Sequence, residues 1–178
     1  MIDLTNQTAK LNSITPRQEC HGEDRVPAFS LGIAWRTTND LLSELDSTLK
    51  FALYKKDEGQ DDLLNDPGHV TKLKYPLLKG PISWDWSGAG YEMTIHQGVS
   101  GKGDITIQDV VLDKLKIDPQ DGGELIVSVK ADCRPTPMQM GELCTMLGSE
   151  ISISLTPPSA SSGSDKPLFD DSFEREAA

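Results

Sequence analysis

The hydrophobic pattern of the chain first becomes regular at residues 26–35. Apolar side chains recur there at every second position, at Phe29, Leu31, Ile33 and Trp35. A period of two turns one face of a β-strand toward a core, so the pattern predicts a strand. Residues 1–25 are polar and irregular and include Pro16. We therefore expect an N-terminal arm that packs only partly.

Residues 39–54 follow a different period. Their apolar side chains are spaced at roughly helical intervals, at Leu41, Leu42, Leu45, Leu49, Ala52 and Leu53. Asn39 is a suitable cap for the first free amide groups. This spacing predicts one broken helix or two short helices. The acidic stretch 57–66 then leads into Pro67 and Gly68, which predicts an exposed loop.

Short β-like runs between turn signals occupy the middle of the chain. They cover residues 70–75, 82–86, 91–97, 104–117 and 124–133. The linkers GVSGKG and DPQDGG supply glycines for the positive φ angles that chain reversals require. The repeated alternation of strand and turn predicts an antiparallel meander.

A helix and a last strand are predicted after the meander. Thr136 is a suitable cap, Pro137 suits the first helical position, and Gln139 completes a capping box. We expect a helix over about 137–147 and a strand over 149–155. Residues 157–178 are rich in serine and glycine and then acidic, a composition that buries too little apolar surface to offset chain entropy. They are predicted to be a disordered acidic tail.

Together these elements predict an α+β fold of mainly antiparallel strands with two short helical segments. A curled sheet, an OB-like barrel and a small sandwich all fit this pattern. A length of 178 residues suits one domain with an appendage. We therefore divide the chain into the arm 1–25, a β-rich globular domain 26–156 and the tail 157–178.

The formal net charge of −11 changes the picture of possible partners. Nucleic-acid affinity arises mainly from lysine and arginine, so the chain as a whole would repel a phosphate backbone. The acids are concentrated in residues 57–66 and in the tail, however, so the sequence still permits a local basic face.

Cysteine usage and hydropathy indicate the compartment. Cys20, Cys133 and Cys144 cannot all pair within one chain and show no C-x-x-C spacing, which fits reduced thiols in a cytosol. Cys144 is expected to be buried in its helix. The sequence has no apolar run of signal-peptide or membrane-spanning length. We expect a soluble cytoplasmic protein with no membrane partner; its oligomeric state stays open.

Candidate sites for catalysis, metals and phosphates are weak. The run Gly98–Gly103 departs from a phosphate loop because His96 and Gly103 stand where Walker A requires glycine and serine or threonine, so we interpret it as a hairpin turn. His21, His69 and His96 lack a second histidine or cysteine at metal-ligand spacing. Cys20-His21 with Glu23-Asp24 is a weak exception. We expect no cofactor, no metal and no catalytic residue, since no nucleophile elbow occurs.

Aromatic residues interleaved with lysines offer a stronger candidate. Period-two geometry places Trp84 and Trp86 on one strand face. Such a face either packs on the core or stacks the bases of single-stranded nucleic acid while lysines neutralise phosphates. The predicted nucleic-acid-binding residues are Trp84, Trp86, Tyr75, Tyr91, Lys72, Lys74, Lys79 and Lys102.

The tail has two interpretations. Residues 168–174 mix acids with phenylalanine, and they resemble the acidic tails with which single-stranded DNA-binding proteins recruit protein partners. The chain ends in Glu176-Ala177-Ala178 instead of the terminal Pro-Phe or Asp-Phe of those tails. A solubilising tail is the alternative. The predicted partner-binding residues are Leu168, Phe169, Asp170, Asp171 and Phe173.

Several short motifs resemble a group of uncharacterised small β-rich proteins encoded by bacterial prophages and mobile elements. The motifs are Asn39-Asp40 through Leu53-Tyr54, Trp84, Gly88-Ala89-Gly90-Tyr91, Pro119-Gln120-Asp121-Gly122-Gly123 and Leu143-Cys144. The resemblance covers about residues 15–156. It implies an accessory role near replication, recombination or host interference, and it carries over no catalytic residue.

The sequence therefore leads to a ranked set of functions. The first is a non-enzymatic, phage-type accessory protein that binds single-stranded nucleic acid. The second is an acidic protein-binding module, or an inhibitor of a host nucleic-acid-binding enzyme, whose 57–66 loop and tail mimic nucleic-acid charge. A hydrolase comes third, and converging histidine and acid side chains in a pocket would be its signature.

Overall fold

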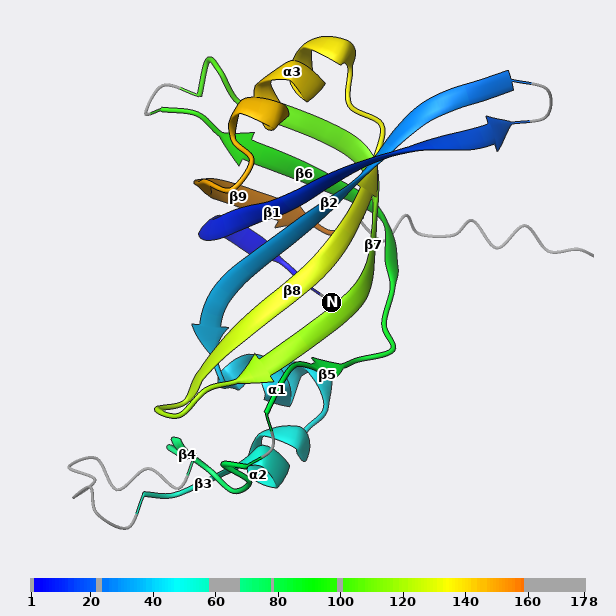
Figure 1. The fold of residues 1–178 in the computed structure, drawn as a ribbon. Helices are drawn as coiled ribbons and strands as arrows, with labels where there is room; N and C mark the ends of the chain where they lie inside the picture. The colour runs from blue at the N-terminus through cyan, green and yellow to red at the C-terminus, as the bar shows by residue number, and fades with distance from the viewer. Residues whose placement is uncertain (1, 22–23, 58–67, 78, 99–100, 159–178) are drawn as a thin grey trace, which may run out of the picture.

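A closed antiparallel β-barrel forms the centre of the molecule (Figure 1). The computed structural model describes residues 2–21, 24–57, 68–77, 79–98 and 101–158. The barrel strands are β1 (Leu4–His21), β2 (Asp24–Thr38), β6 (Gly88–His96), β7 (Ile105–Pro119), β8 (Glu124–Cys133) and β9 (Glu150–Thr156). The prediction of an α+β, mainly antiparallel fold is confirmed, and the barrel is the architecture adopted.

The strand order departs from the predicted meander. The sheet runs β5-β7-β6-β9-β1-β2-β8, and pairing between β7 and β8 closes it into a ring. β5 (Ile82–Ser83) is a short strand beside β7. Strands β6, β7 and β8 do follow one another as a meander, but β9 pairs with both β6 and β1. The predicted meander is confirmed for β6, β7 and β8, whereas β4 (Lys72–Leu73) pairs with β3 (Tyr54–Lys55) and β5 pairs with β7, and these two pairings leave no mark on the local turn signals.

Short helices cover both ends of the barrel. At one end lie α1 (Asp40–Leu45), α2 (Leu49–Leu53) and a two-stranded sheet of β3 (Tyr54–Lys55) and β4 (Lys72–Leu73). At the other end lies α3 (Pro137–Thr145). Leu42 of α1 and Leu143 of α3 are both fully buried in the core cluster. The predictions of two short helices within 39–54 and one over about 137–147 are confirmed.

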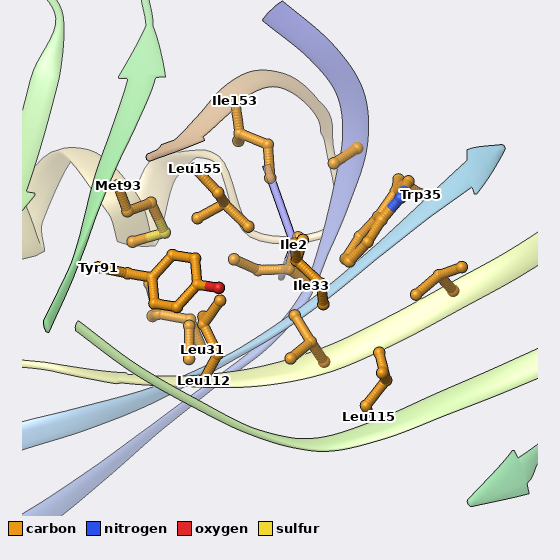
Figure 2. Packing of buried hydrophobic residues seen from close by; sticks show 14 of the residues in the cluster. Ile2, Leu31, Ile33, Trp35, Tyr91, Met93, Leu112, Leu115, Ile153 and Leu155 are labelled. Atoms are coloured by element: carbon orange, nitrogen blue, oxygen red, sulfur yellow. The ribbon is translucent and has the colours of Figure 1, made fainter. Parts of the chain in front are cut away.

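Inward-facing side chains of all six barrel strands fill the barrel (Figure 2). Tyr91 and Met93 of β6, Leu31 and Ile33 of β2 and Leu112 of β7 all point into this interior. Alternation of buried and exposed positions along β6 and β7 produces this packing, and two irregularities in β7, at Asp109 and Lys114, each shift it by one residue. The core is thus built by the period-two pattern that the sequence shows.

The N-terminal arm was predicted wrongly. Residues 4–21 form β1, which pairs with β2 along its length and with β9 near its start. Register shifts lie between Leu4 and Gln7 and between Leu11 and Ser13, and each shift interrupts the alternation of apolar residues. Beyond the barrel, β1 and β2 continue as a projecting hairpin, whose two faces need few apolar side chains (Figure 1). The globular domain therefore begins near Leu4.

Two helix caps were predicted, and one forms. Thr136 accepts a hydrogen bond from the amide of Gln139, and the Gln139 side chain accepts one from the amide of Thr136, which completes the capping box. Asn39 makes no capping hydrogen bond. Its side-chain amide donates to the carbonyl of Val70 at 2.6 Å and so ties α1 to the β4 segment. The Asn39 prediction was wrong because a buried carbonyl recruits this amide.

Some predictions concern residues outside the described part of the chain. They include the acidic loop beyond Asp57 and the partner-binding residues of the tail, Leu168 to Phe173.

Of the cysteines, Cys133 is buried, and burial raises its pKa to about 12, whereas Cys144 is exposed, contrary to expectation. In the described ranges, no helix has the length and apolar character needed to cross a membrane.

Candidate functional site

Both predicted tryptophans turn toward the barrel. The amide of Trp84 donates to the carbonyl of Leu115 at 2.9 Å and so holds this segment against β7. Trp84 and Trp86 are half-buried and pack against the core, whereas Asp85 between them is exposed. Both indoles pack on the core as a shared face would, but the predicted strand ends at Ser83, and the Trp86 amide donates to the Trp84 carbonyl at 3.0 Å in a tight turn. That face packs on the protein, which leaves little ring surface for base stacking.

Tyr91 is excluded from a stacking surface. Its side chain is only 2% exposed, and its ring meets Trp86 edge to face at a centroid distance of 6.3 Å. Burial raises the pKa of Tyr91. A Cβ atom at Gly88 would lie 2.6 Å from the Tyr91 ring and 3.0 Å from the Trp86 ring, so the two aromatics fit tightly around this glycine. Trp86 and Tyr91 form a structural pair.

The predicted lysines are divided between the two ends of the barrel. Lys102 lies in the connection from β6 to β7, which reaches the α3 end (Figure 1). Lys72 and Lys74 lie on or next to β4, at the α1 and α2 end. Tyr75 and Lys79 follow β4 in the chain. The eight predicted residues therefore do not form one surface, but four of them remain grouped.

The group around β4 includes residues that sequence analysis missed. Register places Lys55 of β3 directly opposite Lys72 of β4. Like charges in opposed positions destabilise a strand pair. The carboxylate of Asp57, 3.6 Å from the Lys72 ammonium group, partly offsets this repulsion. Lys55 has no ion-pair partner among the residues that the structure describes. The Lys55-Lys56 pair in the sequence was a usable signal for it.

Exposed apolar side chains lie beside these lysines. Tyr75 is 60% exposed, Leu77 is 91% exposed and Phe51 is 48% exposed. The ammonium group of Lys74 donates to the Phe51 carbonyl, which joins β4 to α2. Lys74, Tyr75, Pro76 and Leu77 line a shallow hollow of about 570 Å³. We call residues 49–57 and 68–83, without residue 78, the lysine-rich end.

The charge of the lysine-rich end differs from that of the whole chain. Its described residues contain one acid, Asp57, and the lysines Lys50, Lys55, Lys56, Lys72, Lys74 and Lys79. Lys50 is mostly buried and paired with Asp40 at 2.7 Å. Of the remaining lysines, Lys74 lines one hollow with the exposed Tyr75, and Lys72 lines a neighbouring hollow with Asp57 and His69. Cationic side chains around an open aromatic ring form a surface on which an anionic, planar ligand can bind.

A second polar cluster lies on the outer face of the barrel. The Nδ1 atom of His96 is 2.8 Å from a carboxylate oxygen of Asp104, and its Nε2 atom is 2.7 Å from the hydroxyl of Ser154. The Ser154 hydroxyl also accepts the amide of Asn6 at 3.0 Å. We call Asn6, His96, Asp104 and Ser154 the Ser154 cluster. Sequence analysis missed it because Ser154 is 58 residues from His96.

Electrostatics hold Asp104 ionised. Its second carboxylate oxygen accepts the amide of Gln97 at 2.9 Å. This hydrogen bond and the one from His96 keep the pKa of Asp104 below its ordinary value. The hairpin between β6 and β7, which was predicted at Gly98–Gly103, brings Asp104 back beside His96. Elsewhere in the described ranges, no group of three or more histidine, cysteine or acidic side chains could hold a metal ion.

Comparisons with known proteins add no assignment. No protein-family model matches this chain, and neither the curated proteins nor the solved structures contain a match.

Proposed function

We propose that this chain is an accessory protein that binds single-stranded nucleic acid through its lysine-rich end. The opposed pair of Lys55 and Lys72, together with the hollow that Lys74 and the exposed Tyr75 line just after β4, carries the proposal. Two ammonium groups held opposite each other are unfavourable in the free protein. A phosphate between them would relieve that repulsion, and binding would then gain energy that the free protein lacks.

Single strands suit this surface better than a duplex. Stacking on Tyr75 requires an unpaired base, and such stacking contributes about 1–3 kcal/mol per base. Lys55, Lys72 and Lys79 are positioned to neutralise phosphates on either side of the stacked base. The surface offers two exposed rings, Tyr75 and the less exposed Phe51, so we expect a short site that binds with little sequence preference.

The negative charge of the rest of the chain limits the bound length. With a net charge of −11, the molecule repels phosphates that lie beyond the lysine-rich end. A weak, local and salt-sensitive contact of this kind fits an accessory role near replication or recombination. The proposal includes this accessory role, an origin among prophage proteins, which the resemblance of the short motifs favours, and a cytoplasmic location.

A protein-binding module is the second candidate. Leu77 is 91% exposed. A leucine side chain neither stacks on bases nor pairs with phosphates, whereas a protein partner would bury it. A partner that buries Leu77 among the lysines would carry acidic side chains, whereas a basic partner, such as a nucleic-acid-binding enzyme, would be attracted by the acids elsewhere in the chain. The two candidates differ in whether oligonucleotide binds at all.

Titration of labelled oligo-dT at two salt concentrations separates them. Three neutralised phosphates predict a slope of about −2 for log affinity against log salt, since each contributes about −0.7 on single strands. Lys72→Glu should abolish most of this binding, and Tyr75→Ala should weaken it about 10-fold or more by removing one stacked base. Lys102→Glu, at the other end of the barrel, is the matched control and should bind like the wild type.

Two results would overturn the nucleic-acid proposal. One is the absence of binding at low salt, which leaves the protein-binding module. The other is equal loss of affinity in Lys72→Glu and Lys102→Glu, which would show that general charge and not this surface governs binding.

A further inference from the structure

We infer that the Ser154 cluster is an acyl-transfer site that hydrolyses short-chain acyl esters. This activity goes beyond the proposed nucleic-acid binding, because the cluster lies on the outer barrel face and not at the lysine-rich end. It rests on the hydrogen-bond chain from Asp104 through His96 to Ser154. A nucleophile, a base and an orienting acid in hydrogen-bond reach of one another are the requirement for activating serine.

The hydrogen bonds determine which nitrogen of His96 acts as the base. Asp104 is ionised and can only accept, so Nδ1 of His96 must carry a proton and donate it to the carboxylate. In a neutral imidazole, Nε2 is then the acceptor for the Ser154 hydroxyl, 2.7 Å away. This is the tautomer that removes a proton from serine. Asp104 is the positioning residue that maintains it.

Asn6 supplies a hydrogen-bond donor beside the nucleophile. It has a φ of +49° in the irregular stretch of β1 between Leu4 and Gln7, a left-handed conformation that is uncommon outside glycine. Because of this bend, its amide points at the Ser154 hydroxyl at 3.0 Å. When the hydroxyl oxygen becomes part of a tetrahedral adduct, the same amide lies within reach of the developing oxyanion. Backbone distortions of this kind concentrate at functional sites.

The surroundings of Ser154 indicate the substrate class. Register places Thr94 opposite Ser154 and Thr106 opposite Thr94, and the two threonine hydroxyls are 3.2 Å apart. Ser152 is the next outward side chain on β9. These small hydroxyl side chains offer no apolar surface to a long acyl chain. The His96 and Asp104 side chains are 25% and 21% exposed, so a small ester of a polar alcohol can approach from solvent.

The reaction balances without a cofactor. The Ser154 oxygen forms a bond to the ester carbonyl carbon, and its proton moves to Nε2 of His96. The tetrahedral adduct then breaks the bond to the alcohol oxygen, which takes the proton from His96 and leaves as the alcohol. Water attacks the acyl group on Ser154 with the same base, and the carboxylic acid leaves as the serine hydroxyl is restored.

The test uses the full chain, p-nitrophenyl acetate and a fluorophosphonate probe. We expect a fluorophosphonate adduct on Ser154, located by mass spectrometry, and saturable release of p-nitrophenol. Ser154→Ala should lose the adduct and reduce kcat/KM about 100-fold or more. Ser128→Ala, which removes an outward-facing hydroxyl of β8 outside the Ser154 cluster, is the matched control and should retain both. Asp104→Asn should lower kcat with KM little changed, since it disturbs the tautomer and not the binding surface.

The adduct needs no variant, so the result does not depend on how the variants fold. A wild-type chain that forms no adduct on Ser154 under conditions that label a serine esterase would overturn the inference. Equal rates for wild type, Ser154→Ala and Ser128→Ala would do the same and would leave the cluster a structural link between β6, β7 and β9.

Discussion

The phenol oxygen of Tyr54 lies 2.8 Å from the carbonyl oxygen of Gln120 and an equal distance from that of Glu124. This contact ties β3 to the turn between β7 and β8, and it fastens the lysine-rich end to the barrel. Tyr54 is fully buried. Burial raises its pKa to about 12, so the hydroxyl stays protonated and available as a donor.

Tyr54→Phe should lower the free energy of unfolding by about 1–2 kcal/mol. The reason is that the buried hydroxyl, shared between two partly buried carbonyl groups, loses its hydrogen bond while the packing of the ring is kept. Urea denaturation monitored by circular dichroism measures the change. Tyr75→Phe removes a hydroxyl from an exposed ring and should leave stability unchanged. Equal stability of wild type and Tyr54→Phe would show that the anchor lies elsewhere.

Trp86→Ala should affect stability and not oligonucleotide affinity. The indole packs edge to face on the buried Tyr91, so its removal leaves a cavity beside the core. We expect a loss of about 2–3 kcal/mol, below the full cost of a buried tryptophan because Trp86 is only half-buried. Unfolding curves and oligo-dT titrations of the same samples provide the comparison. If Trp86→Ala kept its stability but no longer bound oligonucleotide, Trp86 would have the base-stacking role predicted from the sequence.

Asp132 is expected to govern acid stability. Its buried carboxylate accepts the Ser30 hydroxyl at 2.6 Å and pairs with Arg17 at 2.9 Å and Lys130 at 3.0 Å. Burial by itself would raise the pKa of Asp132, but the hydrogen bonds from Ser30 and Lys130 and the nearby positive charges outweigh it, so the pKa is lowered. A pKa below the unfolded value of 3.8 stabilises the fold above pH 3.8, and this contribution is lost as pH falls through the folded value.

Asp132→Asn should therefore reduce stability by about 1–2 kcal/mol at pH 7, because Arg17 and Lys130 lose their shared anion but remain partly solvated. The difference in free energy of unfolding between wild type and variant should become smaller as pH falls below 4. Urea unfolding at pH 7, 4 and 2.5 measures it. Asp85→Asn changes an exposed carboxylate that forms no ion pair with the described residues, and its free energy of unfolding should match that of the wild type at every pH. A gap that is constant with pH would contradict this role of Asp132.

Prediction from the sequence succeeded where the information is local. The alternation that predicted a strand at 26–35 appears in β2, and that at 124–133 appears in β8 with the same limits. Thr136 caps α3 because the capping box requires only residues three positions apart. In β1 the same reasoning failed, since two irregularities shift the alternation partway along the strand.

The candidate sites show the same division. Sequence spacing placed Trp84 and Trp86 on a common face, but only the packing of that segment on β7 decided that the face points inward. Lys72 and Lys74 were found from the sequence, while the position of Lys55 opposite Lys72 depends on pairing across an intervening loop.

The sequence by itself determined the periodic strands, the capped helix, the turns and the acidic balance of this protein, because each depends on neighbours along the chain. Only the tertiary structure decided which strands pair, which aromatic faces are covered and that Ser154 meets His96. The physical reason is that closing the barrel joins β9 to β6 and β1, and such long-range contacts are selected by the packing of the whole core and not by any local pattern.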